Sequence, residues 1–284
     1  MERLVQLGAD MAKLWDRCGG DYLNGIKNTL ILALVATIIG CLIGLVCGIL
    51  QTIPHTKNDP PVKRFFLALI RAIVRVYVEV FRGTPMVLQA VFVYYGLPYF
   101  TNNAVKFDNI WLAAILVVSI NTGAYMAETV RGGILSIDPG QTEGAMAIGM
   151  NHMQIMTNVI LPQALRNIMP QIGNNLIINI KDTCVLSIIS VVELFYNVKS
   201  IVGATYAFFP AYSIAMVIYF ILTFTCSRIL RVIEDRMAGP DSYDLAMNDT
   251  LMGEGMTKYR PRPVETNADY RARQEQPETS EGGM

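Results

Sequence analysis

Residues 30–53 read LILALVATIIGCLIGLVCGILQTI, with no charged side chain among them. An α-helix needs about 20 consecutive apolar residues to cross the hydrocarbon core of a bilayer, so this stretch predicts a membrane-spanning helix. Gly40, Gly44 and Gly48 recur at every fourth position within it. Their spacing predicts either a smooth ridge on which a second helix packs closely, or only the glycine enrichment common in membrane helices.

Four further apolar stretches follow along the chain. They cover residues 85–100, 111–126, 168–195 and 208–225. In the first of them, Thr84 is a candidate N-cap and Pro85 suits the first helical position. With residues 30–53, these stretches predict an all-α integral membrane protein with five spanning helices.

Residues 62–82 form a different kind of segment, because charges interrupt the apolar pattern. The charged side chains fall at helical spacing on one face: Arg64, Arg71, Arg75, Glu79 and Arg82. Such a helix either lies along the membrane surface or forms the first part of a long helix that continues past Pro85. We do not count it as a separate span.

The composition limits the possible classes of protein. Apolar residues make up 52% of the 284 residues and charged residues only 16%, against roughly 25% charged in soluble domains. This composition excludes a disordered chain and argues against a soluble enzyme. The five cysteines show no C-x-x-C spacing and the two histidines lie far apart, so we expect neither a disulfide framework nor a metal site.

The charges are balanced overall but unevenly distributed. Residues 1–236 carry 18 basic and 14 acidic side chains, whereas residues 237–284 carry 5 and 9. The second part has few large apolar residues and cannot bury a core, so residues 237–284 are predicted to form a flexible acidic tail. With five spans, the loops on the side of residues 53–83 and 131–167 hold the excess of basic residues. The positive-inside rule places that side and the tail in the cytoplasm, and the N-terminal arm of residues 1–23 outside.

The long loop between the third and fourth spans carries a helical pattern of its own. Asp138 and Pro139 predict a helix start, with the aspartate as N-cap and the proline at the first position. Small residues follow at Gly144, Ala145, Ala147 and Gly149. A short exposed helix with a small-residue face suits docking into a groove of another protein. At the end of the loop, Pro162 is expected to end or turn the chain.

Polar residues line one face of the fourth span, within an arc of roughly 140° at 100° per residue. They are Asn167, Gln171, Asn174, Asn175, Asn179 and Asp182. Such a stripe either lines a path for a polar solute or supplies hydrogen bonds between helices. The buried-acid candidates Glu128 and Asp182 need partners, for which Arg131 and Lys181 are available, or they attract the ammonium group of a substrate.

At this point the chain resembles the permease subunits of ABC importers. Their cytoplasmic EAA loop has the pattern E-A-A, three residues, G, nine residues, I, one residue, L-P. Here Glu143-Gly144-Ala145, Gly149, Val159 and Leu161-Pro162 stand at those positions, departing only by Gly144 for Ala and Val159 for Ile. The stretch Arg82-Gly83-Thr84-Pro85 resembles the signature of the polar amino acid (histidine-, glutamine- or arginine-type) uptake branch, as do residues 123–133 and Lys181-Asp182-Thr183.

The resemblance covers residues 24–236 and implies a type I importer permease domain there. It implies that Glu143 to Gly149 form a coupling helix that docks in a cleft of a separate ATPase subunit, with Leu161 and Pro162 shaping the return to the fourth span. The implied substrate pathway includes Glu128, Gln171, Asn175, Asn179, Asp182 and Thr183. The implied partners are a second permease (the same or a related chain), two ATPase subunits and an extracytoplasmic amino-acid-binding protein.

No catalytic activity is expected of this chain itself. A phosphate-binding P-loop needs a Gly-Lys pair, and the sequence contains none. ATP and Mg²⁺ are therefore expected in the partner ATPase. The chain itself is expected in the cytoplasmic membrane of a bacterium. Two other readings remain open: a membrane scaffold or sensor that docks an ATPase without transporting, and an ion-driven secondary carrier.

Overall fold

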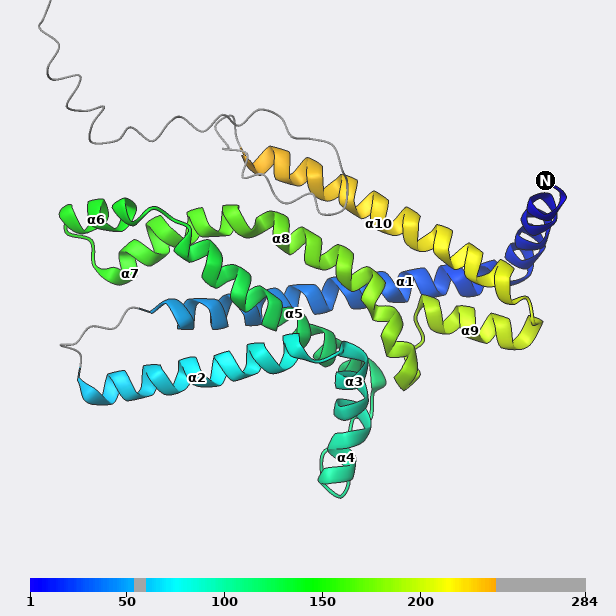
Figure 1. Ribbon diagram of the computed structural model, residues 1–284, viewed down its shortest axis with the longest axis horizontal. Helices are drawn as coiled ribbons and strands as arrows, with labels where there is room; N and C mark the ends of the chain where they lie inside the picture. The colour runs from blue at the N-terminus through cyan, green and yellow to red at the C-terminus, as the bar shows by residue number, and fades with distance from the viewer. Residues whose placement is uncertain (54–59, 239–284) are drawn as a thin grey trace, which may run out of the picture. The chain divides into compact units, whose positions relative to one another are not determined.

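The computed structural model describes residues 1–53 and 60–238. Every regular element within those ranges is a helix (Figure 1), which confirms the predicted all-α class. The predicted acidic tail lies outside the described residues from 239 onward, as do residues 54–59. Contacts along the chain gather Met1–Pro240 into one compact unit.

Three of the described helices are long and apolar enough to cross a membrane on their own. They are Glu2–Thr52, Ile110–Leu135 and Phe208–Arg236. A further candidate is a broken one, in which His152–Ile189 and Leu194–Thr205 meet at a bend of 52°. The remaining apolar stretch, Met86–Phe100, is shorter. At 1.5 Å per residue it measures about 22 Å, less than the roughly 30 Å hydrocarbon core.

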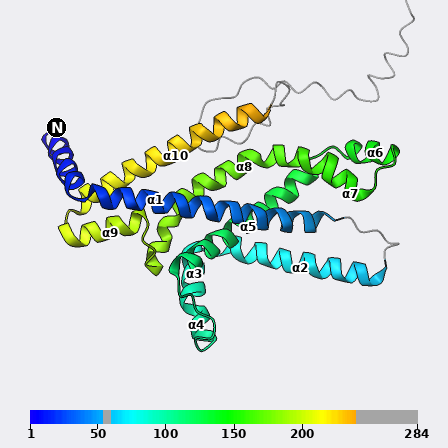
Figure 2. The same ribbon diagram turned by 180° about the vertical axis from the view of Figure 1, so that it is seen from behind.

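Helices α1 (Glu2–Thr52) and α5 (Ile110–Leu135) form the central pair of the bundle. They lie against each other lengthwise, as Figure 2 shows from behind. The glycine ridge of α1 faces α5: a Cβ atom on Gly40 would lie 2.7 Å from the Cβ of Thr122, and one on Gly48 would lie 2.6 Å from the Cβ of Val130. The close-packing interpretation of the glycine repeat is therefore the correct one.

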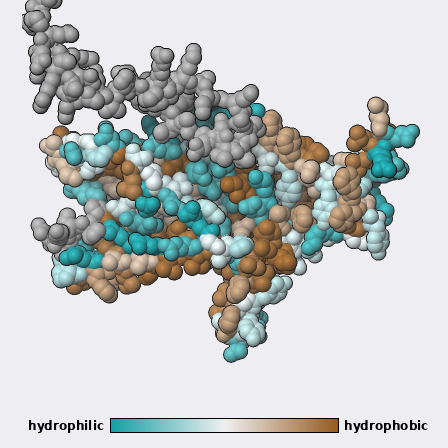
Figure 3. Space-filling view, in the orientation of Figure 1, coloured by the Kyte–Doolittle hydropathy of each residue, from teal (hydrophilic) through white to brown (hydrophobic). Residues whose placement is uncertain are grey.

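Helix α2 (Pro61–Gly83) packs along α5 instead of lying apart from the bundle. The Tyr77 hydroxyl donates to the Ile120 carbonyl oxygen at 2.6 Å, and Val74 and Val78 pack against Ala127. The apolar side chains of its other face are exposed and gather along the outer edge of α2 in Figure 3. The helix ends at Gly83, so it does not continue straight past Pro85.

The chain changes direction after α2 and enters α3 (Met86–Val91), the π-helical turn η1 (Phe92–Gly96) and α4 (Leu97–Phe100). This segment projects sideways from the bundle (Figure 1). Thr84 was predicted to be the N-cap of this helix, and that prediction is wrong. Thr84 is extended, and Pro85 is the N-cap of α3. The Thr84 hydroxyl instead donates back to the carbonyl oxygen of Val80 at 2.8 Å, at the end of α2.

After α5 the chain forms a helical turn and returns as a long helix. The elements are α6 (Pro139–Ala147), α7 (His152–Ile155), the π-helical turn η2 (Met156–Ile160) and α8 (Leu161–Asp182). Pro162 was predicted to end or turn the chain, but it lies in the first turn of α8 and the helical path continues through it. The π-helical turn η2 directly precedes α8, and the Leu161 amide donates to the Met156 carbonyl oxygen.

The last elements cross back over α1. They are the 3-10 helix η3 (Thr183–Ile189), α9 (Leu194–Thr205) and α10 (Phe208–Ala238). Gly25 of α1 lies so close to α9 that a Cβ atom would come within 2.6 Å of the Leu194 Cα. The Tyr22 hydroxyl donates to the Ala211 carbonyl oxygen at 3.2 Å, which joins α1 to α10.

Candidate functional site

The first part of the site is the start of the loop helix α6. An oxygen of the Asp138 side chain accepts the Gly140 amide at 2.7 Å, and Pro139 occupies the first turn. A short polar side chain at this position satisfies one of the amides that a helix start leaves free. The predicted cap is therefore confirmed, and it fixes where the helix begins.

Helix α6 is anchored by one residue and exposed elsewhere. Ala145 is buried in a cluster with Ile155 and Ile160 of the returning chain. Glu143 and Gly144 are exposed, and no atom lies within 4 Å of a Cβ placed on Gly144. The small-residue face of α6 is thus only partly used inside this chain.

Gly149 makes the turn that follows α6. Its φ of +85° is a left-handed conformation that favours glycine, and its amide donates to the Met146 carbonyl oxygen at 2.9 Å. Open space surrounds the position where a Cβ atom would stand. The glycine of the loop pattern is therefore required by the backbone and not by a neighbouring side chain.

Helix α7 begins with a capping box that the sequence reasoning missed. The Gln154 amide donates to the Asn151 side chain at 3.0 Å, and the Asn151 amide donates to the Gln154 side chain at 2.9 Å. The signal was present as a polar N-cap with glutamine three residues later. Leu161 and Pro162 then start α8, the first half-buried and the second exposed.

The loop helices lie at the end of the bundle where α1 also ends (Figure 1). Leu45 and Ile49 of α1 pack on the cluster that holds Ala145, together with Val130 and Ile134 of α5. The loop helices therefore share one apolar cluster with the ends of the central helix pair.

Two amides of the fourth span, Asn175 and Asn179, are buried in the chain's own interior. The Nδ2 atom of Asn179 donates to the Thr37 hydroxyl of α1 at 2.7 Å and to the Thr122 hydroxyl of α5 at 3.0 Å. All three side chains are buried. Asn179 therefore joins three helices, which favours the interhelical alternative for this residue.

Asn175 and its neighbours divide between interior and surface. Asn175 is buried and donates to the Gln171 carbonyl oxygen at 3.0 Å and to the Met126 sulfur at 3.1 Å. Thr183 is buried and donates to the Ile180 carbonyl oxygen at 3.1 Å. Asn167, Asn174 and Asp182 are exposed, and Gln171 is half-buried. The predicted stripe is thus not one continuous polar face.

Glu128 forms an ion pair with Arg82 of α2, which was predicted to lie on the charged face of residues 62–82 and in a family motif but not to pair with Glu128. The expected pairing with Arg131 is not among the ion pairs of the described residues. The Arg82 guanidinium also lies 5.3 Å from the centre of the Tyr125 ring, a cation–π distance. Both charged side chains remain about two-fifths exposed, so the pair faces a space outside the bundle core.

The turn that carries Arg82-Gly83-Thr84-Pro85 is held by two amides that were not predicted. The Gln89 side-chain nitrogen donates to the carbonyl oxygens of Phe81 and Thr84, each at 2.9 Å. Asn121 of α5 donates to the Gln89 side-chain oxygen at 3.1 Å. These bonds satisfy carbonyl groups that the end of α2 leaves free. Gly83 is exposed, with no atom within 4 Å of its Cβ position.

Glu193 is a further residue that the sequence reasoning missed. It is fully buried, and its carboxylate accepts the amides of Phe195 at 2.9 Å and Tyr196 at 2.6 Å, which caps α9. The Tyr219 hydroxyl of α10 donates to the same carboxylate at 3.2 Å. The only signal was an acid within an apolar run, and one of its partners, Tyr219, comes from a distant helix. Across the described ranges, His, Cys, Asp and Glu do not form a group of three or more that could hold a metal.

Comparison with known proteins finds a matching family and several similar chains. Residues 62–239 match the family described as binding-protein-dependent transport system inner membrane component. The glutamine transport system permease protein GlnP of Escherichia coli strain K12 is 36% identical over 215 residues, covering 76% of this chain and 92% of that protein. The arginine transport system permease protein ArtQ of Bacillus subtilis is 32% identical over 222 residues, covering 77% and 93%.

Two solved structures share the fold. A chain of an amino acid ABC transporter crystallised with histidines superposes with a TM-score of 0.67 at 34% identity, covering 78% of this chain and 95% of that chain. An inward-facing MetNI methionine ABC transporter gives a TM-score of 0.56 at 21% identity, over 76% and 93%.

Proposed function

The chain belongs to the family of binding-protein-dependent transport system inner membrane components, and on that premise we propose that it translocates a polar amino acid. It is the membrane-spanning permease subunit of an ABC importer and works with an ATPase and a binding protein. Relatives named for glutamine and arginine transport support a polar amino acid as the solute. The relationship gives no support to a scaffold that does not transport.

One observation supports the coupling role. Helix α6 and its glycine turn are exposed at the end of the bundle, and Ala145 belongs to an apolar cluster that includes side chains of α1 and α5. A groove in the ATPase would receive Glu143 to Gly149, and its closure would move α6 against the central pair. Movement of packed helices about a fixed contact is the usual form of such a transition. Alternating access of the pathway would follow.

For the pathway we propose Glu128 and Arg82 as the groups that meet the solute. The pair is partly exposed, and it offers one charge of each sign to the ammonium and carboxylate groups of an amino acid. Asp182 is exposed near the end of α8 and is a second candidate. Asn175 and Asn179 are already engaged with neighbouring helices, so we propose a structural role for them.

We place the loop helices and the end of α1 in the cytoplasm, with the start of α1 and the turn before α9 outside. The excess of basic residues on the loop side supports this orientation. The assembly would contain a second permease, either a second copy or a related chain, and two ATPase subunits that bind ATP and Mg²⁺. These ligands belong to the ATPase, and this chain supplies the docking helix and the path.

The test is reconstitution of the chain with its ATPase and binding protein in vesicles. Hydrolysis of ATP and uptake of labelled solute are measured over a panel of glutamine, arginine, histidine and an apolar amino acid. We expect one or a few polar amino acids to raise both rates together. ATPase binding without uptake of any amino acid in the panel would contradict the proposal.

A further inference from the structure

The first 22 residues form an amphipathic helix with an apolar face and a charged face. At about 100° per residue, most of the large apolar side chains fall within an arc of about 100°, whereas Val5 lies outside it, beside Asp16. The side chains within the arc are Leu4, Leu7, Met11, Leu14, Trp15, Cys18 and Tyr22. The charged side chains occupy an arc of about 140° on the opposite side. They are Glu2, Arg3, Asp10, Lys13, Asp16, Arg17 and Asp21.

The second half of this apolar face is covered by the protein. Leu14 and Tyr22 are buried against α9 and α10, and Met11 and Cys18 are partly buried against the same cluster. Trp15 stacks on Tyr22 with ring centres 5.8 Å apart, but remains 41% exposed. The arm is therefore fixed at its base by packing.

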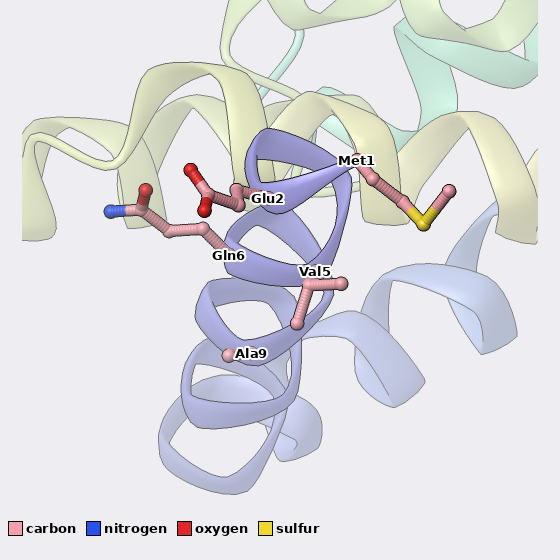
Figure 4. Close-up of a pocket in the computed structure, with 5 residues that line it drawn as sticks. All are labelled: Met1, Glu2, Val5, Gln6 and Ala9. Atoms are coloured by element: carbon pink, nitrogen blue, oxygen red, sulfur yellow. The ribbon is translucent and has the colours of Figure 1, made fainter.

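The first half of the apolar face is covered less than the second half. Leu4 is 73% exposed, and Leu7 is half-buried. The shallow depression beside Val5 is lined by one helix alone and has no opposing wall (Figure 4). It lies where the apolar face meets the charged face, and it offers no groove in which a protein side chain would be enclosed.

The arm joins directly to the helix that spans the membrane. After the arm, Leu23, Leu30, Ile31 and Leu34 of the same helix are exposed. The last three lie in the uncharged span, where their neighbours outside the protein are acyl chains. Figure 1 shows the first turns of α1 directed across the line of the rest of that helix. Gly19 and Gly20 lie in this region, and glycines are a common place for a helix to bend.

We propose that residues 1–18 form an interfacial helix that lies in the membrane surface, with Leu4 and Trp15 among the lipid headgroups and upper acyl carbons. Amphipathic helices bind in this way, and aromatic side chains favour that depth. Residues 1–18 carry three basic and three acidic side chains, so attraction to anionic lipid contributes little. Zwitterionic lipid is sufficient for its binding.

The experiment uses the full chain, reconstituted in phosphatidylcholine vesicles with Trp111→Phe so that Trp15 is the single tryptophan. Fluorescence is quenched either by lipids brominated at upper acyl carbons or by iodide in the water. We expect the brominated lipid to remove most of the Trp15 emission and iodide to remove little. Adding phosphatidylglycerol should leave both values unchanged.

A paired variant tests the apolar face directly. Leu4→Ser with Leu7→Ser should increase quenching by iodide, whereas the matched change Glu2→Ser on the charged face should not. The parent protein decides the matter even if the paired variant folds poorly. Strong quenching of Trp15 by iodide and weak quenching by brominated lipid would overturn the proposal. So would shielding that appears only at high protein-to-lipid ratio, since it would assign this face to a second copy.

Discussion

Asn179 and Glu128 show two different ways in which polar side chains are accommodated among these helices. Asn179 is buried and bonds to hydroxyl groups on two other helices. Glu128 is partly exposed and forms an ion pair with Arg82. A buried amide that finds partners stabilises a bundle, whereas an exposed ion pair adds little because water screens it. The two residues should therefore respond differently to substitution.

Replacing Asn179 with leucine should lower the stability of the bundle by about 1–2 kcal/mol, the usual range for hydrogen bonds between membrane helices. The change removes the bonds to Thr37 and Thr122 and leaves two buried hydroxyl groups with fewer partners. Thermal unfolding in detergent measures the effect. Asn174→Leu, on the exposed side of the same helix, is the matched control and should change little. Loss of uptake in Asn179→Leu with unaltered unfolding would point to solute contact instead.

Exchanging the charges of Arg82 and Glu128 should separate structure from transport. Each single change, Arg82→Gln or Glu128→Gln, should lower stability by less than about 1 kcal/mol because both side chains are partly exposed. Each should lower uptake about tenfold or more, since a hydrogen bond to a charged group contributes about 1.5–3 kcal/mol. The swap Arg82→Glu with Glu128→Arg keeps the pair but misplaces both charges. Recovery of full uptake in the swap would show that the pair is only structural.

At the scale of elements, the bundle is organised by how closely backbones approach. The α1–α5 pair is close because Gly40, Gly44 and Gly48 replace side chains along one face of α1. The end of α2 is instead held by polar groups, as Gln89 binds the carbonyl oxygens of Phe81 and Thr84. A glycine repeat can be read from one segment of sequence. The hydrogen bonds that Gln89 makes at the end of α2 cannot be predicted from one segment, because Asn121, which donates to Gln89, comes from another helix.

Gly44→Ala should destabilise the α1–α5 pair by about 1–3 kcal/mol, the usual cost of inserting atoms into a packed contact. A Cβ atom on Gly44 would overlap Met126 and the backbone of α5. Gly132→Ala is the matched control, because its Cβ position has no atom within 4 Å and alanine favours the helix. Denaturant-induced unfolding of the two variants in detergent compares them. Equal stability of the two variants would mean that α1 and α5 can move apart to admit the methyl group at no cost in free energy of unfolding.

At the scale of the whole molecule, local sequence patterns predicted individual helices, whereas tertiary contacts determined which of their polar residues are buried and which are exposed. Apolar runs predicted spanning helices, and the Asp138-Pro139 start of α6 was predicted residue by residue. Helical periodicity grouped Asn175 and Asn179 with exposed Asp182, because it cannot tell a neighbouring helix from an aqueous path. The partner of Glu128 was likewise missed, since Arg82 is distant in sequence. The start of α6 was predicted because a helix cap depends on adjacent residues, whereas the left-handed turn at Gly149 was not predicted.

Gly149→Val should uncouple the transporter while leaving the spanning bundle intact. Valine at φ +85° costs about 1–3 kcal/mol of backbone strain, so the turn between α6 and α7 would rearrange. Capture of the ATPase by the tagged permease, and amino-acid-stimulated ATP hydrolysis in vesicles, should both fall. Gly144→Ala is the matched control, since the site is exposed, helical and free of neighbours within 4 Å. Normal stimulation of ATP hydrolysis in Gly149→Val would show that coupling does not depend on the conformation of this turn. The contact with the ATPase would then lie elsewhere on the exposed face of α6 and α7.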